Sequence, residues 1–227
     1  LSANMQPDLG SDLLANKKSV IVIWLIISIS FTFHLLSLLA GQTLLKDWTL
    51  AHPESHASIE MSGSVIALFV AIFLLYFERT GRGSNFNIQI SAALLGMGIL
   101  DGFHAIVPVG QNFVWLHSMA TLVAGLLFSC IFFPQRWTLF RSYRWPLIVG
   151  ISAILFGVTT LLLPELTPTM VSSKQFTPLA QTLNVVGGSL LLISAIRLYY
   201  SFYQNKNVDN FLFCLHCILF GSAAIMF

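Results

Sequence analysis

The chain has 227 residues, of which 56% are hydrophobic and only 9% are charged, and its formal net charge is +2. This apolar composition excludes a water-soluble domain and indicates an integral membrane protein. The small net charge gives no nucleic-acid-binding footprint, so we expect no nucleic-acid partner.

Seven apolar runs, separated by short polar breaks, are predicted to be membrane helices. In chain order they cover residues 18–40, 58–77, 88–108, 113–133, 145–163, 178–203 and 210 to the end. Each run has about the length, roughly 18–25 residues, at which a helix crosses the hydrocarbon core of a bilayer. We therefore expect a single domain over residues 1–227, an all-α polytopic transmembrane bundle with seven visible helices in contact with lipid.

The distribution of Lys and Arg predicts the orientation, because cytoplasmic loops of membrane proteins retain positive charge. Nine of the 11 Lys and Arg residues fall on one side of the predicted bundle, with Arg197 counted there, and only Lys46 and Lys174 fall on the other. We therefore expect a cytoplasmic N-terminal tail over residues 1–17. An odd number of crossings directs the seventh helix outward, so an output module on the cytoplasmic side requires an eighth helix in the full-length protein.

Ionisable residues inside the predicted helices gather toward the outer side of three consecutive helices. His56 and Glu60 lie four apart at the start of the second helix, Asp101 and His104 lie three apart near the end of the third, and His117 is early in the fourth. These spacings put each pair on one helix face. Because successive helices alternate in direction and rise about 1.5 Å per residue, we expect all five at similar depth.

Ionisable residues in membrane helices are costly and therefore mark functional sites. Imidazoles and carboxylates on neighbouring helices form a suitable ligand set for zinc, copper or iron, and two of the histidines also suit a haem iron. The predicted metal ligands are His56, Glu60, His104 and His117. Three further residues are predicted to orient the ligands or to sense a stimulus, and these are Asp101, His52 and His34.

Two other interpretations of the same residues stay open at this point. In one, the side chains form a purely structural network, with Glu60 paired to His104 or Asp101 paired to His117 across helices. In the other, they sense protons or a small ligand directly. Metal binding and sensing are compatible with each other.

Two further motifs are assigned to packing. Cys214 and Cys217 have the spacing of a thiol motif, but they lie in an apolar run, so we expect them to be small buried side chains. Gly187 and Gly188 follow no strand and lie in a membrane span, so we expect them to permit close helix packing and not to bind a nucleotide.

Three short motifs together resemble the MASE-type membrane-associated sensor domains of bacterial signalling proteins. They are the His56–Glu60 step, the stretch from Leu94 that ends in Asp101-Gly-Phe-His104, and Trp115-Leu-His117. The likeness covers about residues 50–135. It implies a sensory input module in the bacterial inner membrane, without enzyme activity of its own. It also implies a full-length homodimer with a cytoplasmic output domain: a histidine kinase of a two-component system, a diguanylate cyclase or a phosphodiesterase.

The main alternative function is an intramembrane metal-dependent hydrolase. Hydrolases of the adiponectin-receptor and ceramidase type also resemble a seven-helix bundle with His and Asp residues around zinc, but their histidines lie on the first and last helices. Here the last visible helix offers only His216, which we expect on the cytoplasmic side. A transporter or channel requires polar residues through the whole depth, whereas the inner halves of these helices are almost uniformly apolar. The sequence therefore favours a sensor in which the outer cluster shifts a helix-packing equilibrium.

Overall fold

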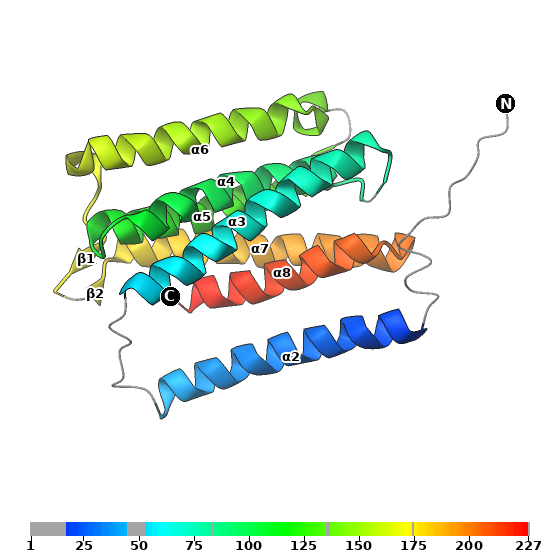
Figure 1. The fold of residues 1–227 in the computed structure, drawn as a ribbon, viewed down its shortest axis with the longest axis horizontal. Helices are drawn as coiled ribbons and strands as arrows, with labels where there is room; N and C mark the ends of the chain where they lie inside the picture. The colour runs from blue at the N-terminus through cyan, green and yellow to red at the C-terminus, as the bar shows by residue number, and fades with distance from the viewer. Residues whose placement is uncertain (1–16, 45–52, 83, 135–136, 174, 227) are drawn as a thin grey trace.

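A computed structural model describes residues 17–44, 53–82, 84–134, 137–173 and 175–226, and the statements below refer to these residues. They form a bundle of long helices (Figure 1). The helices are α2 (Lys17–Gln42), α3 (Pro53–Arg79), α4 (Asn87–Ile106), α5 (Gln111–Phe128), α6 (Arg144–Leu162), α7 (Pro178–Asn205) and α8 (Val208–Ile225). Short 3₁₀ turns cover Ser129–Phe132, Thr138–Arg141 and Pro164–Leu166, and β1 (Val171–Ser172) pairs with β2 (Gln175–Phe176) as an antiparallel hairpin.

The predicted all-α transmembrane bundle is confirmed. Six of the helices, α3 to α8, are long and apolar enough to cross a membrane. α2 adds a further apolar helix of 26 residues, which corresponds to a length of about 39 Å. The clearest boundary difference is at α3, which begins at Pro53 and not near residue 58, so His56 lies within the helix.

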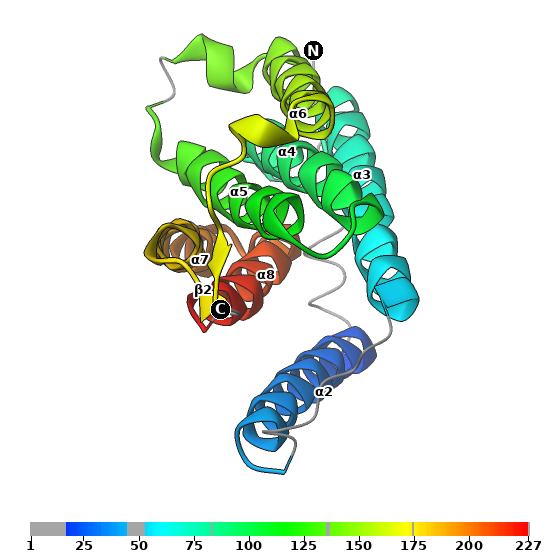
Figure 2. The ribbon, with the colours of Figure 1, turned by 90° about the vertical axis from the view of Figure 1, so that its left-hand side faces the viewer.

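α4 is the central helix of the bundle. α3, α5 and α6 pack directly against α4, while α5 also packs against α7, which pairs in turn with α8. A view along the bundle shows α3 and α6 on one side of α4, with α7 and α8 beyond α5 (Figure 2). α2 lies at the edge of the bundle beside α8, where the rings of Trp24 and Phe211 meet with their centroids 5.7 Å apart.

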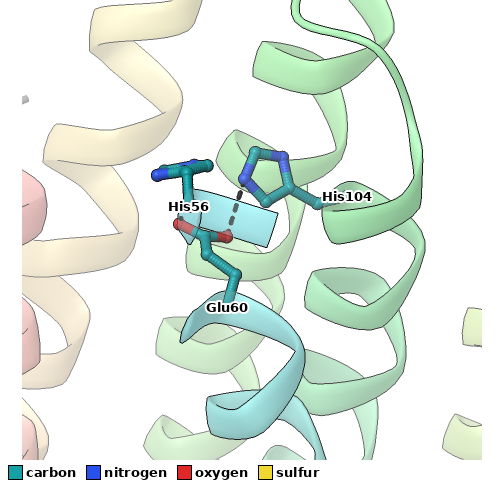
Figure 3. Close-up of side chains that lie close together, drawn as sticks. All are labelled: His56, Glu60 and His104. Carbon is teal, nitrogen blue, oxygen red and sulfur yellow. Dashed lines mark ion pairs between the residues drawn. The ribbon is translucent and has the colours of Figure 1, made fainter. Parts of the chain in front are cut away.

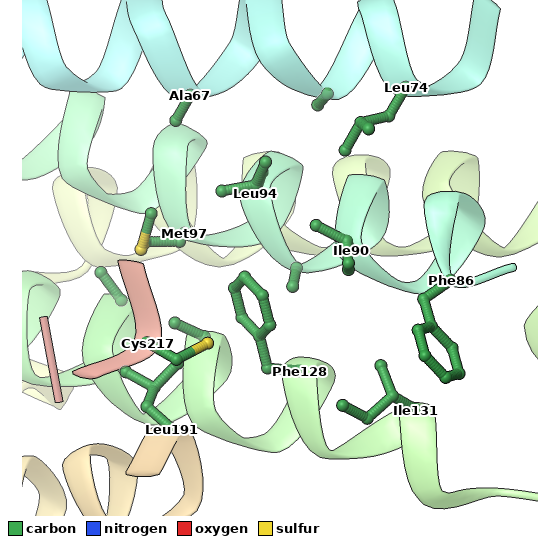
Figure 4. Close-up of a cluster of buried hydrophobic side chains, with 14 of the residues drawn as sticks. Ala67, Leu74, Phe86, Ile90, Leu94, Met97, Phe128, Ile131, Leu191 and Cys217 are labelled. Carbon is green, nitrogen blue, oxygen red and sulfur yellow. The ribbon is translucent and has the colours of Figure 1, made fainter. Parts of the chain in front are cut away.

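The main apolar core fills the space between α3, α4, α5, α7 and α8 (Figure 4). A smaller second cluster joins Val114, Met170 and Ala180. Ile90 and Phe128 are fully buried within it, and Cys214 and Cys217 belong to the same core. The expectation that these cysteines act as small buried side chains is therefore confirmed. Large apolar side chains also cover the outward faces of the helices, as expected where the surrounding solvent is lipid.

Glycines allow α5, α7 and α8 to approach closely. A Cβ added at Gly187 would lie 2.6 Å from the carbonyl oxygen of Thr121 in α5. A Cβ added at Gly188 would lie 2.7 Å from the carbonyl oxygen of Gly221 in α8. Both distances are far inside van der Waals contact, so the predicted packing role of Gly187 and Gly188 is confirmed.

We call the end of the bundle at which α3 begins and α4 ends the cluster end. At the opposite end, buried polar side chains connect α4 with the α7–α8 turn. Asn210 Nδ2 donates to Ser201 Oγ at 3.0 Å, Ser84 Oγ donates to Asn210 Oδ1, and Asn87 Nδ2 donates to the Arg82 carbonyl at 3.0 Å. The expectation that the helix halves at this end are almost uniformly apolar is therefore wrong. Isolated Ser and Asn residues hardly change the mean hydropathy of an apolar run, so the hydropathy pattern did not indicate these buried polar side chains.

The Gly187→Ala substitution is expected to destabilise the bundle, because its methyl group fits only if α5 and α7 separate. We expect a loss of about 1–3 kcal/mol in the free energy of unfolding, measured as a lower Tm of the purified domain. The control is Gly150→Ala, where the nearest atom lies 3.8 Å from the added Cβ. It should leave stability unchanged or slightly raised. Equal Tm values for the two variants would contradict the close packing of α5 and α7.

Candidate metal centre

Five ionisable side chains from three helices meet at the cluster end. They are His56 and Glu60 from α3, Asp101 and His104 from α4, and His117 from α5. Their ligand atoms form two sets, His56–Glu60–His104 and Glu60–Asp101–His117, and within each set they lie within 4.8 Å of one another. We call these five residues the His–Glu–Asp cluster. The structure thus brings together all five residues that the sequence placed at one depth.

His104 is held in one orientation by the backbone of α5. Its Nδ1 lies 2.7 Å from the carbonyl oxygen of Phe113, and because a carbonyl only accepts hydrogen bonds, Nδ1 carries the proton. Nε2 consequently faces Glu60, whose Oε2 is 2.7 Å away (Figure 3). Both of these atoms hold lone pairs, so the contact requires a proton or a metal cation shared between them. A histidine oriented through its other ring nitrogen is typical of metal sites.

Glu60 connects the two ligand sets. Its Oε1 lies 3.3 Å from His56 Nε2, one helical turn away on α3, and its Oε2 contacts His104 on α4. The side chain of His56 is 48% exposed, whereas that of His104 is 1% exposed. The cluster therefore extends from an accessible imidazole to a fully buried one, with the carboxylate between them.

Asp101 holds a buried acceptor that the described residues leave unsatisfied. Its Oδ1 has no hydrogen-bond partner among them. Buried polar atoms without a partner are rare and destabilising, and a bound cation would satisfy this one. The sequence suggested an orienting role for Asp101, but its place beside Glu60 and His117 makes it equally suited to direct ligation.

One distance in the cluster fits a transition metal ion directly, and a second fits after a small adjustment. Four tetrahedral nitrogen or oxygen ligands at 2.0–2.1 Å from zinc have donor atoms about 3.3 Å apart. The distance of 3.3 Å between His56 Nε2 and Glu60 Oε1 already matches this value. The distance of 2.7 Å between His104 Nε2 and Glu60 Oε2 must lengthen by roughly 0.6 Å to match it, a small side-chain adjustment.

The same geometry favours a bare ion over haem. The Glu60 carboxylate lies between the imidazoles of His56 and His104 and contacts both of them. A porphyrin between these two histidines would occupy the position of the carboxylate. The nitrogen and oxygen donors suit zinc, iron or copper(II), and the cluster contains no thiolate.

The chain has three histidines besides those of the cluster. His34 lies in α2 and its side chain is outside the described part of the structure, and His52 lies outside the described residues. His216 lies in the middle of α8 and not at the cytoplasmic side as expected, with its ring 5.7 Å from that of Phe128. His216 and Glu60 both line an apolar groove between α3 and α8, although His216 belongs to neither ligand set.

The β1–β2 hairpin covers the cluster, and the sequence did not predict it. Gln111, the first residue of α5, accepts from the amides of Met170 and Val171 at 2.6 and 2.9 Å and donates to the Val171 carbonyl at 2.8 Å. Val171 and Phe176 then line a pocket of about 380 Å³ whose walls include His56, Glu60 and His104. We call it the hairpin pocket. It gives a ligand from outside the bundle a route to the cluster.

The Gln111→Ala substitution is expected to release the hairpin, because it removes one donor and one acceptor that hold three backbone groups. Amide hydrogen exchange at Met170 and Val171 should accelerate, with a local loss of about 1–3 kcal/mol. Gln175→Ala in β2 is the control, since its exposed side chain should leave this exchange unchanged. Full protection of both amides in Gln111→Ala would show that the side chain does not hold the hairpin.

Comparisons of the chain with models of known protein families, with curated proteins and with solved structures find no match. The resemblance to MASE-type sensor domains therefore stays a prediction from the motifs. The geometry of the cluster is the evidence for function.

Proposed function

We propose that this chain is a sensory input domain of a bacterial inner-membrane protein and binds a divalent transition metal ion at the His–Glu–Asp cluster. The observation that carries the proposal is the convergence of five ligand-type side chains from three helices at one end of an apolar bundle. A charged side chain at the centre of a membrane helix costs about 2.5–3.5 kcal/mol or more, and ionisable residues within membrane helices are rare, so such a concentration indicates a role. The Lys and Arg distribution supports an outward-facing cluster and a cytoplasmic N-terminus.

A metal ion at this position would join α3 to α4 and α5. α3 lies close to α4, and small side chains join the two helices. Ser64 Oγ donates to the Gly98 carbonyl at 2.5 Å, and Ser91 Oγ donates to the Ala71 carbonyl at 2.9 Å. α3 is also the least buried of the six apolar spans. An ion that binds α3 only at its cluster end would change how the rest of α3 packs. Such a bistable helix is a physical basis for a signal.

We infer a cytoplasmic output for the full-length protein on the basis of the motif resemblance. The residues between His56 and His117 that resemble MASE-type domains suggest a histidine kinase or a cyclic-di-GMP enzyme beyond a further helix. Both kinds of output work as homodimers, so we expect the full-length protein to be a dimer.

An intramembrane metal-dependent hydrolase is the second candidate, and the hairpin pocket favours it. Catalytic zinc sites commonly have three protein ligands and one open position. The set His56–Glu60–His104 offers three ligands at the wall of a pocket of about 380 Å³. A substrate in this pocket would reach the open position directly.

The first test is metal binding by the purified domain in nanodiscs, measured by calorimetry with zinc and by elemental analysis after dialysis. We expect near-stoichiometric zinc and a loss of affinity of more than about 100-fold in His104→Ala and in Glu60→Ala, since each removes a ligand. His216→Ala is the control, because this histidine lies outside both ligand sets. A protein that binds no metal, or equal binding by all variants, would leave the cluster as a structural network.

The second test separates a sensor from a hydrolase. Spin labels at Ile72 in α3 and Ile196 in α7 would report the distance between these helices, and both side chains point outward, with exposures of 58% and 71%. A sensor should show a shift in this distance distribution when zinc is added, and Glu60→Ala should abolish the shift. Zinc binding with an unchanged distribution would favour a rigid catalytic site.

A further inference from the structure

A long apolar groove runs along the bundle between α3 and α8. Its volume is about 860 Å³, within the usual range for small-molecule sites, and its floor includes Leu94 and Met97 of α4. Ile59 and Phe73 of α3 lie at its rim and are 73% and 57% exposed, so the groove opens sideways where a membrane would supply lipid. α2 lies on the side of the bundle that α3 and α8 form (Figure 2). A molecule dissolved in the bilayer would therefore have direct access.

One end of this groove is polar. Glu60, Asp101 and His117 line it at the cluster end, whereas most of the remaining lining is aliphatic or aromatic. Asp101 Oδ1 is buried there without a hydrogen-bond partner among the described residues. The groove therefore offers an apolar channel with an unused acceptor at its cluster end, which is the complement of an amphiphile that carries a hydrogen-bond donor. His216 Nε2, in the wall of the groove, also has no hydrogen-bond partner among the described residues.

The charge of the lining selects among amphiphiles. The ionisable side chains on the described walls are three carboxylates, Glu60, Asp101 and Asp209, and two histidines, His117 and His216, with no Lys or Arg. An anionic headgroup such as a phosphate or a fatty acid carboxylate would meet like charges in a poorly solvated site, which is unfavourable. A neutral hydroxyl would instead donate to Asp101 Oδ1 at little desolvation cost.

We propose that the α3–α8 groove binds a neutral lipid-soluble molecule that has a hydroxyl-bearing headgroup, with the hydroxyl on Asp101 and the tail along α3. An alkylated hydroquinone serves as the probe of this class. This site does not require a bound ion. It shares Asp101 with the ligand set Glu60–Asp101–His117, so it is compatible with an ion held by His56, Glu60 and His104, whereas an ion held directly by Asp101 would exclude the hydroxyl. The groove and the hairpin pocket are adjacent, because Glu60 and His117 line both of them.

Gly63 provides a selective way to block the groove. It lies on the groove wall in α3, and a Cβ added there meets nothing within 4 Å. A leucine at this position would therefore extend into the open groove without displacing protein atoms, and replacing a helical glycine does not weaken the helix. Gly41→Leu is the matched control, since Gly41 in α2 also has open space around an added Cβ and does not line the groove.

The experiment measures equilibrium binding of tritiated decylhydroquinone to the domain in phosphatidylcholine nanodiscs, without oxygen, against empty nanodiscs. We expect saturable binding of one molecule per domain, at least about tenfold weaker binding in Gly63→Leu, and wild-type binding in Gly41→Leu. The dimethyl ether of the probe, which lacks the donor, should bind at least about tenfold more weakly to the wild type. In Asp101→Leu this preference for the hydroxyl form should disappear.

Uptake equal to that of empty nanodiscs would overturn the proposal, because the groove would then be filled by α2 or by lipid chains. Wild-type affinity in Gly63→Leu would also overturn it, as would equal binding of the probe and its dimethyl ether. Zinc content is measured on the same samples, and Gly63→Leu should retain it. Probe binding without zinc would contradict the metal function alone, whereas zinc binding without probe binding would contradict the groove alone.

Discussion

The partly buried carboxylate of Glu60 is the constraint on which the cluster end depends. A carboxylate in a membrane helix must be compensated within the bundle, and Glu60 is compensated by His56 on its own helix and by His104 on α4. His104 can face Glu60 because the Phe113 carbonyl holds its other nitrogen. That carbonyl is within reach because α4 ends at Ile106 and α5 begins at Gln111, so the turn between them is short. The contacts of Glu60 with His104, and of His104 with the Phe113 carbonyl, thus join α3, α4 and α5 at the cluster end.

The cluster separates two spaces of different character. The hairpin pocket lies on one side, under β1–β2, and the α3–α8 groove lies on the other and opens toward the membrane. Glu60 and His117 line both spaces, so a ligand in either one meets the same two side chains. Binding in one space would alter the charge that the other space presents. This arrangement suits a sensor that combines a water-soluble metal ion with a molecule dissolved in the bilayer.

The sequence predicted the helices and the convergence of the cluster for simple physical reasons. Membrane helices need long apolar runs, and the alternating direction of successive helices is enough to put His56, Asp101 and His117 at one depth. The apolar run predicts a start of the second helix near residue 58, whereas α3 begins at Pro53. The residues before 58 include proline and polar side chains, which end an apolar run but are tolerated in the first turn of a helix.

Other features depend on contacts between segments that are distant in the sequence. The Phe113 carbonyl that orients His104 is a backbone group, and every residue type has one. The sequence therefore could not predict this contact. The clamp by Gln111 joins residues about 60 positions apart, and a two-residue strand such as Val171–Ser172 leaves no hydrophobic period to detect. The groove exists because α3 and α8 pack against other helices and leave space between themselves, which hydropathy does not report.

X-ray absorption at the zinc edge of the metal-loaded domain tests the central claim most directly. The account predicts a shell of nitrogen and oxygen atoms at about 2.0–2.1 Å with outer scattering from at least two imidazoles. A sulfur shell near 2.3 Å, which would place the metal at the cysteines, or a fully hydrated ion would contradict it.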